Sequence, residues 1–259
     1  MSLKSTNPTK TNSWNKLRNH FNDIKDTHID TMFTDDIDRA EKFSVSWKDF
    51  YFDFSKNKIN SETISLFNDL LIEIDFKSSI EKYFSGEKIN STESRAVLHT
   101  ALRASENQKI LVNKKDIIPE IKTVKEKMKL FTASVLNGNH RGFKGDKITD
   151  VVNIGIGGSD LGPSMVVESL SHYKTDLNTY FISNVDGDHL NEVLSKVNPE
   201  TTIFIIVSKT FTTIETLTNA NSVRSWFLKS ASENDISKHF IAVSSNVEKV
   251  IEYGCLLYT

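Results

Sequence analysis

Residues 151–163, with the sequence VVNIGIGGSDLGP, constrain the fold of this chain more than any other stretch. The apolar run over 151–156 predicts a buried strand, and a helical pattern starts near Leu161. The glycines between them allow positive φ and carry no Cβ, so backbone N–H groups there can approach an anion closely. The following helix directs the positive end of its dipole at the same point. The stretch therefore predicts a phosphate-binding turn.

A second strand with a donor-rich loop follows at residues 203–213. The buried run IFIIV ends in SKTFTT, which brings hydroxyl side chains together with the ammonium group of Lys209. Thr212 followed three positions later by Glu215 has the spacing of a capping box, which predicts that the next helix begins at the end of this loop. The chain therefore contains two loops that present donors at a helix N-terminus.

From residue 148 onward, strand and helix patterns alternate. The predicted strands cover residues 151–156, 179–183, 202–207 and 240–243, and the predicted helices cover 161–172, 189–196 and 214–228. Strands that are apolar on both faces, with helices between them, predict an α/β fold with a doubly wound parallel sheet. A sheet that stopped after its fourth strand would leave an unpaired edge and favour aggregation.

The flavodoxin-like strand order 2-1-3-4-5 makes the first and third strands neighbours, and ligands bind beyond the carboxyl ends of such strands. Both donor loops follow these two strands. The sequence therefore predicts one crevice that contains Gly158, Ser159, Ser208, Lys209, Thr210 and Thr213. Thr212 is expected mainly as a helix cap, with its backbone N–H also available to a phosphate.

Residues 1–147 are predicted to form a mainly helical region, followed by the α/β domain over 148–259. Helical spacing of apolar residues is seen over 14–24, and again over 64–74 after a predicted cap at Ser61. Alternation over 43–54 predicts strands or a hairpin, and the tryptophans and phenylalanines are expected in the core. Asn90 and Glu93 have capping-box spacing before a predicted helix over 92–103. A further helix is predicted over 116–136, then a turn-rich linker over 137–146.

The charge composition excludes several partners. The 32 basic and 34 acidic residues give a net charge of −2 without long blocks of one sign, so neither nucleic acid nor an anionic membrane is expected as a partner. The apolar runs are too short to span a bilayer. The single cysteine, Cys255, excludes an internal disulfide, and the polar start lacks a signal peptide, so the chain is expected in the cytoplasm. The 7 histidines show no metal-ligand spacing, so no metal is expected.

Three kinds of phosphate ligand can be compared for the crevice. The dinucleotide-binding pattern requires a third glycine, and this chain has Asp160 at that position. The mononucleotide P-loop requires a glycine directly before its lysine, and here Ser208 precedes Lys209. Several neutral donors and one lysine instead suit the terminal phosphate of a small molecule, without a cofactor or metal. Nucleotide binding stays a weaker option.

Residues 153–163 and 208–216 closely resemble two motifs of the glucose-6-phosphate isomerase family, and residues 92–99, 148–152 and 183–187 support the resemblance. It covers roughly residues 12–254, the amino-terminal half of that family. The resemblance implies a sugar-isomerase domain and the isomerisation of glucose 6-phosphate to fructose 6-phosphate in glycolysis and gluconeogenesis. It also implies that Gly158, Ser159 and residues 208–213 hold the sugar phosphate. Full-length relatives are homodimers; the resemblance leaves the state of this chain open.

The resemblance assigns no catalytic residue to this chain. In the family, the glutamate base, the ring-opening histidine and lysine, and the arginine near the enediolate come from the second half. The last residues, after Gly254, do not resemble the corresponding segment of relatives, as in a broken gene, a frameshift or a partial sequence. The chain is therefore expected to bind sugar phosphate without isomerising it. The alternative is a non-catalytic sugar-phosphate-binding regulatory module on the same fold.

Overall fold

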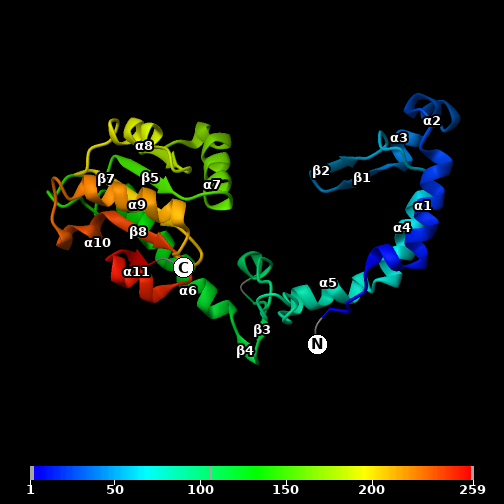
Figure 1. The fold of residues 1–259 in the computed structure, drawn as a ribbon, viewed down its shortest axis with the longest axis horizontal. Coiled ribbons are helices and arrows are strands. Elements are labelled where there is room, and N and C mark those ends of the chain that lie inside the picture. The colour runs from blue at the N-terminus through cyan, green and yellow to red at the C-terminus, as the bar shows by residue number, and fades with distance from the viewer. Residues whose placement is uncertain (1–2, 106, 258–259) are drawn as a thin grey trace. The chain divides into compact units, whose positions relative to one another are not determined.

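The computed structural model describes residues 3–105 and 107–257. The chain divides into two compact units, Met1–Pro119 and Glu120–Thr259. The first unit contains mainly helices and two small hairpins, and the second contains a parallel sheet with helices (Figure 1). Helix α6 (Ile118–Leu136) begins where the two units meet in the sequence, two residues later than predicted. The predicted domain boundary near residue 147 remains a prediction.

The first unit confirms the helices and the hairpin predicted before residue 86. Helix α1 (Asn12–Ile24) packs against α4 (Ser61–Glu73), and β1 (Ser44–Trp47) pairs antiparallel with β2 (Phe50–Asp53). The other elements are η1 (Pro8–Lys10), α2 (Ile29–Asp35), α3 (Arg39–Lys42), α5 (Phe76–Ser85), η2 (Ala101–Arg103), β3 (Leu111–Val112) and β4 (Lys115–Asp116).

The start of α4 is fixed by a capping box one residue before the predicted cap. The side chain of Asn60, rather than Ser61, accepts the N–H of Thr63 at 3.0 Å, and the Thr63 hydroxyl accepts the N–H of Asn60 at 3.1 Å. Asn and Ser are about equally good N-cap residues, so their capping preferences could not decide which of the two caps the helix. The same hydroxyl contacts Nε2 of the buried His20 on α1 at 2.7 Å, which ties the two helices together.

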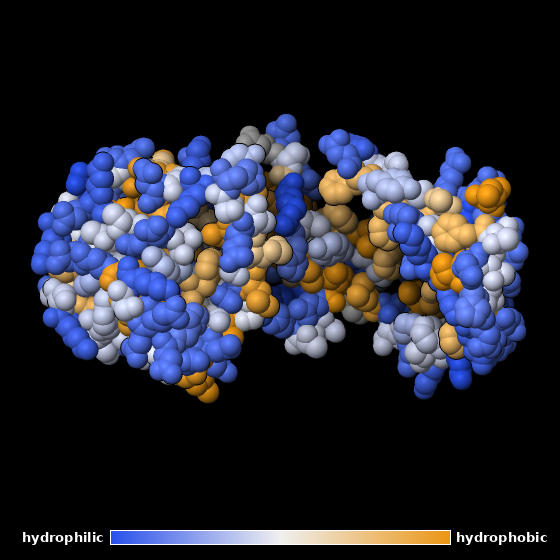
Figure 2. All heavy atoms as spheres, turned by 90° about the horizontal axis from the view of Figure 1, so that it is seen from above, coloured by the Kyte–Doolittle hydropathy of each residue, from blue (hydrophilic) through white to orange (hydrophobic). Residues whose placement is uncertain are grey.

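Several aromatic residues expected in the core are exposed instead. Phe21 on α1 and Phe67 on α4 expose 61% and 46% of their surface and line an apolar cavity of about 350 Å³. In the hairpin, Trp47 and Phe50 are 62% and 69% exposed and stack on each other with centroids 5.7 Å apart. Apolar side chains are accordingly visible at the molecular surface (Figure 2). Helical or strand periodicity identifies the apolar face, but not what covers it.

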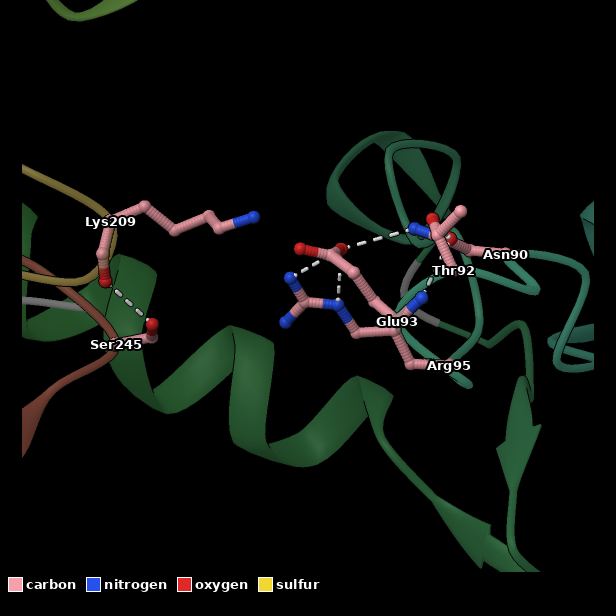
Figure 3. A network of polar contacts seen from close by, with 6 residues as sticks. All are labelled: Asn90, Thr92, Glu93, Arg95, Lys209 and Ser245. Carbon is pink, nitrogen blue, oxygen red and sulfur yellow. Dashed lines mark hydrogen bonds and ion pairs between the residues drawn. The ribbon is translucent and has the colours of Figure 1, made fainter.

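The helix predicted over 92–103 is wrong. Asn90 and Arg95 instead form an antiparallel bridge around a turn in which Ser94 has a φ of 52°. Asn90 does accept the N–H of Glu93 at 3.2 Å, as a capping residue would, but the Glu93 carboxylate is held by Asn90 at 3.0 Å and by Arg95 at 2.6 and 2.9 Å (Figure 3). These local side-chain bonds satisfy the backbone in a turn and so compete with the helix.

The second unit contains a five-stranded sheet whose paired strands are all parallel (Figure 1). The strand order is β6-β5-β7-β8-β9, so the four predicted strands have the flavodoxin-like order 2-1-3-4, as expected, and β9 adds a fifth. The strands are β5 (Asp150–Ile154), β6 (Asn178–Ile182), β7 (Thr202–Val207), β8 (Phe240–Val243) and β9 (Leu256–Leu257). The edge expected to be bare after the fourth strand carries β9, whose Leu256 pairs with Ile241.

Helices pack on both faces of this sheet. Besides α6, they are α7 (Gly158–Ser169), α8 (Gly187–Leu194), α9 (Ile214–Phe227), α10 (Ile236–His239) and α11 (Val247–Tyr253), with 3-10 turns η3 (Ser171–Tyr173) and η4 (Glu233–Asp235). On one face, Phe204 and Ile206 of β7 belong to the main core with residues of α8 and α9. On the other, Ile203 packs with Val135 of α6. This alternation is the side-chain period of a strand.

Among the described residues, no helix has the length and apolar character needed to cross a membrane.

Candidate phosphate site

The strand pairing places the two donor loops side by side at the carboxyl-terminal ends of the strands. Strands β5 and β7 are adjacent and parallel, and Ile154 at the end of β5 lies opposite Ile206. The chain leaves β5 through Gly155 and leaves β7 into residues 208–213, hereafter the β7–α9 loop. Each loop leads into the N-terminus of a helix, α7 or α9, where backbone N–H groups and the helix dipole favour an anion.

The turn after β5 requires its glycines for different reasons. Gly157, the N-cap of α7, has a φ of 61°, which side-chain-bearing residues rarely adopt. A Cβ on Gly155 would lie 2.7 Å from the carbonyl oxygen of Ser159. A Cβ on Gly158 would have no described atom within 4 Å. The first residue of α7 therefore faces open space, as an anion site requires.

Contacts from β5 and from the turn that follows it fix the backbone of Ser159. The side chain of Asn153, near the end of β5, donates to the Ser159 carbonyl oxygen at 3.0 Å. Because Gly155 lies against the same carbonyl, two contacts fix the first turn of α7 relative to the strand. Asp160, in that turn, is buried, and its Oδ1 has no hydrogen-bond partner within the described part of the chain.

The β7–α9 loop is anchored by an apolar side chain at its centre. Phe211 has a φ of 52°, is only 2% exposed, and packs edge-on against Tyr253 of α11 with ring centroids 5.6 Å apart. On either side of this anchor, the side chains of Lys209, Thr210 and Thr212 are exposed. The loop thus turns one apolar residue inward and presents its polar residues outward.

Hydrogen bonds join the hydroxyls of this loop in pairs. Ser208 Oγ lies 3.2 Å from Thr213 Oγ1, and Thr210 Oγ1 lies 2.6 Å from Thr212 Oγ1. The predicted capping box of Thr212 and Glu215 is therefore wrong. The N-cap of α9 is Thr213, and within the described structure its side chain makes no capping hydrogen bond. The hydroxyls of Thr212 and Thr213 contact Thr210 and Ser208 instead of the α9 backbone.

The sequence analysis did not predict a third loop at the carboxyl-terminal ends of the strands. This loop, residues 244–246, is hereafter the β8–α11 loop. The hydroxyl of Ser245 donates to the carbonyl oxygen of Lys209 at 2.7 Å (Figure 3). The N–H of Ser245 donates to the same oxygen at 3.0 Å. Asn246 donates to the carbonyl oxygen of Thr210 at 3.0 Å. The one available signal was the position of Asn246, three residues before Lys249, which is typical of an N-cap and fits the start of α11. No local pattern reveals that Asn246 also contacts another loop.

This arrangement suits binding of an anion. It combines two helix N-termini, hydroxyl groups and the ammonium group of Lys209, which together match a phosphate dianion. No three His, Cys, Asp or Glu side chains gather as metal ligands in the part of the chain that the structure describes.

Comparison with known proteins decides the family. Residues 53–256 match the phosphoglucose isomerase family. The chain belongs to this family. It is 52% identical over 252 residues to a glucose-6-phosphate isomerase from Christiangramia forsetii, a match that covers 97% of this chain and 46% of the relative. The chain thus spans about half the length of the curated relative.

Two solved structures have a fold similar to that of this chain. A glucose-6-phosphate isomerase from Chlamydia trachomatis matches with a TM-score of 0.82 and 23% identity, over 98% of this chain and 48% of that one. A hypothetical protein from Thermus thermophilus matches with a TM-score of 0.52 and 19% identity, over 76% of this chain and 40% of that one. At these identities the matches show a shared fold.

Proposed function

We propose that this chain is the phosphate-binding part of a cytoplasmic glucose-6-phosphate isomerase. In this proposal, the 6-phosphate of glucose 6-phosphate or fructose 6-phosphate lies between the two helix N-termini. The residues that bind it are Gly158, Ser159, Ser208, Lys209, Thr210, Thr212 and Thr213. Family membership and the names of the relatives support the sugar phosphate as ligand. Nothing in these relatives favours the regulatory alternative.

The observation that carries the proposal is the adjacency of β5 and β7, because it puts both donor loops at the same edge of the sheet. One loop contributes Gly158, where no described atom would contact a Cβ, and the other contributes Lys209. A phosphate dianion bound there would accept charge-assisted hydrogen bonds, which are stronger than neutral ones.

The proposal includes binding without turnover. Isomerisation moves a proton between C2 and C1 of the sugar through an enediol, which needs a positioned base. No residue of this chain matches the family's base, and the phosphate loops alone bind substrate and transition state equally. We therefore expect the purified 259-residue chain to convert no glucose 6-phosphate above a protein-free control in a coupled assay. Turnover above that control would refute this part.

Calorimetric titration with glucose 6-phosphate tests the binding, with glucose and NAD as comparison ligands. We expect glucose 6-phosphate to bind and glucose and NAD not to bind. Gly158→Ala puts a methyl group into the open space where the phosphate is proposed to bind, so at least one hydrogen bond to it should be lost. The affinity should fall about tenfold or more, because one hydrogen bond to a charged group contributes about 1.5–3 kcal/mol. The matched control is Gly162→Ala in the same helix, where a Cβ also meets open space. Equal affinity in Gly158→Ala and the wild type would place the phosphate elsewhere.

A further inference from the structure

The β8–α11 loop holds the backbone of the β7–α9 loop at two successive carbonyl groups. The Lys209 carbonyl oxygen accepts the Ser245 N–H at 3.0 Å, the Ser245 hydroxyl at 2.7 Å and the Ser244 hydroxyl at 3.2 Å. The Thr210 carbonyl oxygen accepts the Asn246 amide at 3.0 Å. Three donors thus converge on one carbonyl oxygen, which has two lone pairs, so its capacity to accept hydrogen bonds is fully used.

These contacts determine which way the intervening amide points. The peptide bonds of this loop are trans, and in a trans peptide the N–H points opposite to the C=O. Since the Lys209 carbonyl is directed at Ser245, the N–H of Thr210 is directed away from the β8–α11 loop. Lys209 and Thr210 are two residues of the proposed phosphate site, so their backbone orientation bears directly on its donors.

Asn246 has a second role that ties this contact to a helix. Its Oδ1 accepts the N–H of Lys249 at 3.2 Å and so caps α11, while its Nδ2 donates to Thr210. Phe211, the next residue of the β7–α9 loop, packs on Tyr253 at the end of the same helix. The β7–α9 loop is therefore attached to both ends of α11.

We infer that Ser245 and Asn246 are positioning residues for the phosphate site, which set the backbone orientation of the β7–α9 loop and thereby its affinity for phosphate. The inference rests on the proposed function for its ligand. Neither residue touches the anion: both act through the carbonyl groups of Lys209 and Thr210. Their hydrogen bonds keep these two peptide groups in one orientation before phosphate arrives, which lowers the ordering cost of binding.

Two neutral substitutions separate positioning from helix capping. Asn246→Ser keeps a good N-cap for α11 but is too short to reach the Thr210 carbonyl. Ser245→Ala removes the hydroxyl donor to Lys209 and keeps the backbone donor, and Ser245→Thr restores the hydroxyl. Asn60→Ser is the matched control, because Asn60 caps α4 in the other unit. None of these changes alters the charge near the anion.

The experiment measures the affinity of each full-length variant for inorganic phosphate and glucose 6-phosphate, together with the thermal midpoint. We expect Asn246→Ser and Ser245→Ala to weaken binding about three- to tenfold, the effect of one lost hydrogen bond, with midpoints within the range of Asn60→Ser. Ser245→Thr and Asn60→Ser should bind like the wild type. Unchanged affinity in both Asn246→Ser and Ser245→Ala would overturn the inference.

Carbon-13 signals of the Lys209 and Thr210 carbonyls keep the inference testable even if the wild type binds no phosphate. In that case the proposed function fails, and the positioning is decided by these signals alone. Loss of a hydrogen bond should shift the Thr210 carbonyl in Asn246→Ser and the Lys209 carbonyl in Ser245→Ala. Signals that stay at their wild-type positions in both variants would overturn it.

Discussion

His239, at the end of α10, makes stability depend on pH in a defined window. Its side chain is completely buried, with Nδ1 donating to the Thr202 carbonyl at 2.6 Å and Nε2 accepting the Phe143 N–H at 2.9 Å. The ring also lies against Phe227, with centroids 4.9 Å apart. Only the neutral imidazole satisfies both contacts, because a proton on Nε2 would face another N–H group.

Burial lowers the pKa of His239 from its ordinary value of 6.5, and the hydrogen bond to Thr202 opposes this shift only in part. Below pH 6.5 the unfolded chain therefore binds more protons at this site than the folded one. The stabilisation is complete above pH 6.5 and is lost as the pH falls toward the folded pKa, with a slope of up to about 1.4 kcal/mol per pH unit. Carboxyl groups with lowered pKa, such as Asp53 and Asp235, titrate from an ordinary value of 3.8 and so act at lower pH.

Urea unfolding between pH 5 and 7.5 measures this slope. His239→Gln should lose the slope and, at pH 7.5, about 1–3 kcal/mol for each buried partner left unpaired. His172→Gln, an exposed histidine of the same unit, should keep the wild-type slope. If His239→Gln does not fold, the imidazole pKa of His239 in the wild type decides by NMR: a value at or above 6.5 would refute the reasoning.

Three further predictions concern other sites. Gly155→Ala should lower the free energy of unfolding by about 1–3 kcal/mol, because its Cβ overlaps Ser159, whereas Gly162→Ala should be neutral or stabilising by up to about 1 kcal/mol in chemical denaturation; equal stabilities would contradict this. Burial raises the pKa of the Cys255 thiol to about 12, so a thiol reagent at pH 8 should label it only after unfolding, and rapid labelling of the folded chain would count against its burial. Arg39→Met should destabilise the chain by at least about 2 kcal/mol, because this buried guanidinium donates to three carbonyl oxygens; a thermal midpoint like that of the wild type would show these contacts to be dispensable.

Strand and helix patterns were sufficient to predict strands β5 to β8 and helices α7 to α9 of the second unit, because their signals are local. An apolar run such as residues 203–207 must be buried on both faces, and consecutive parallel strands with helices between them allow few topologies. The observed order follows from that restriction. The position of the two donor loops follows from the strand order alone, without any side-chain contact.

The errors arose where distant or competing contacts decide the structure. The helix predicted over 92–103 loses to a turn that the side chains of Asn90, Glu93 and Arg95 stabilise among themselves. The hydroxyl of Thr212 pairs with Thr210 rather than with the α9 backbone, and propensity does not distinguish these two partners. Ser245 and Asn246 were missed because their partners lie 36 residues away in the sequence.

The central claim is that both donor loops bind one phosphate, and an amide NMR titration of the full chain with glucose 6-phosphate tests it most directly. The account predicts that the backbone signals of Gly158 and Ser159 shift together with those of Lys209 and Thr210. All four should saturate with one dissociation constant, and glucose alone should shift none of them. Shifts confined to one loop, or two different dissociation constants, would contradict a single phosphate site.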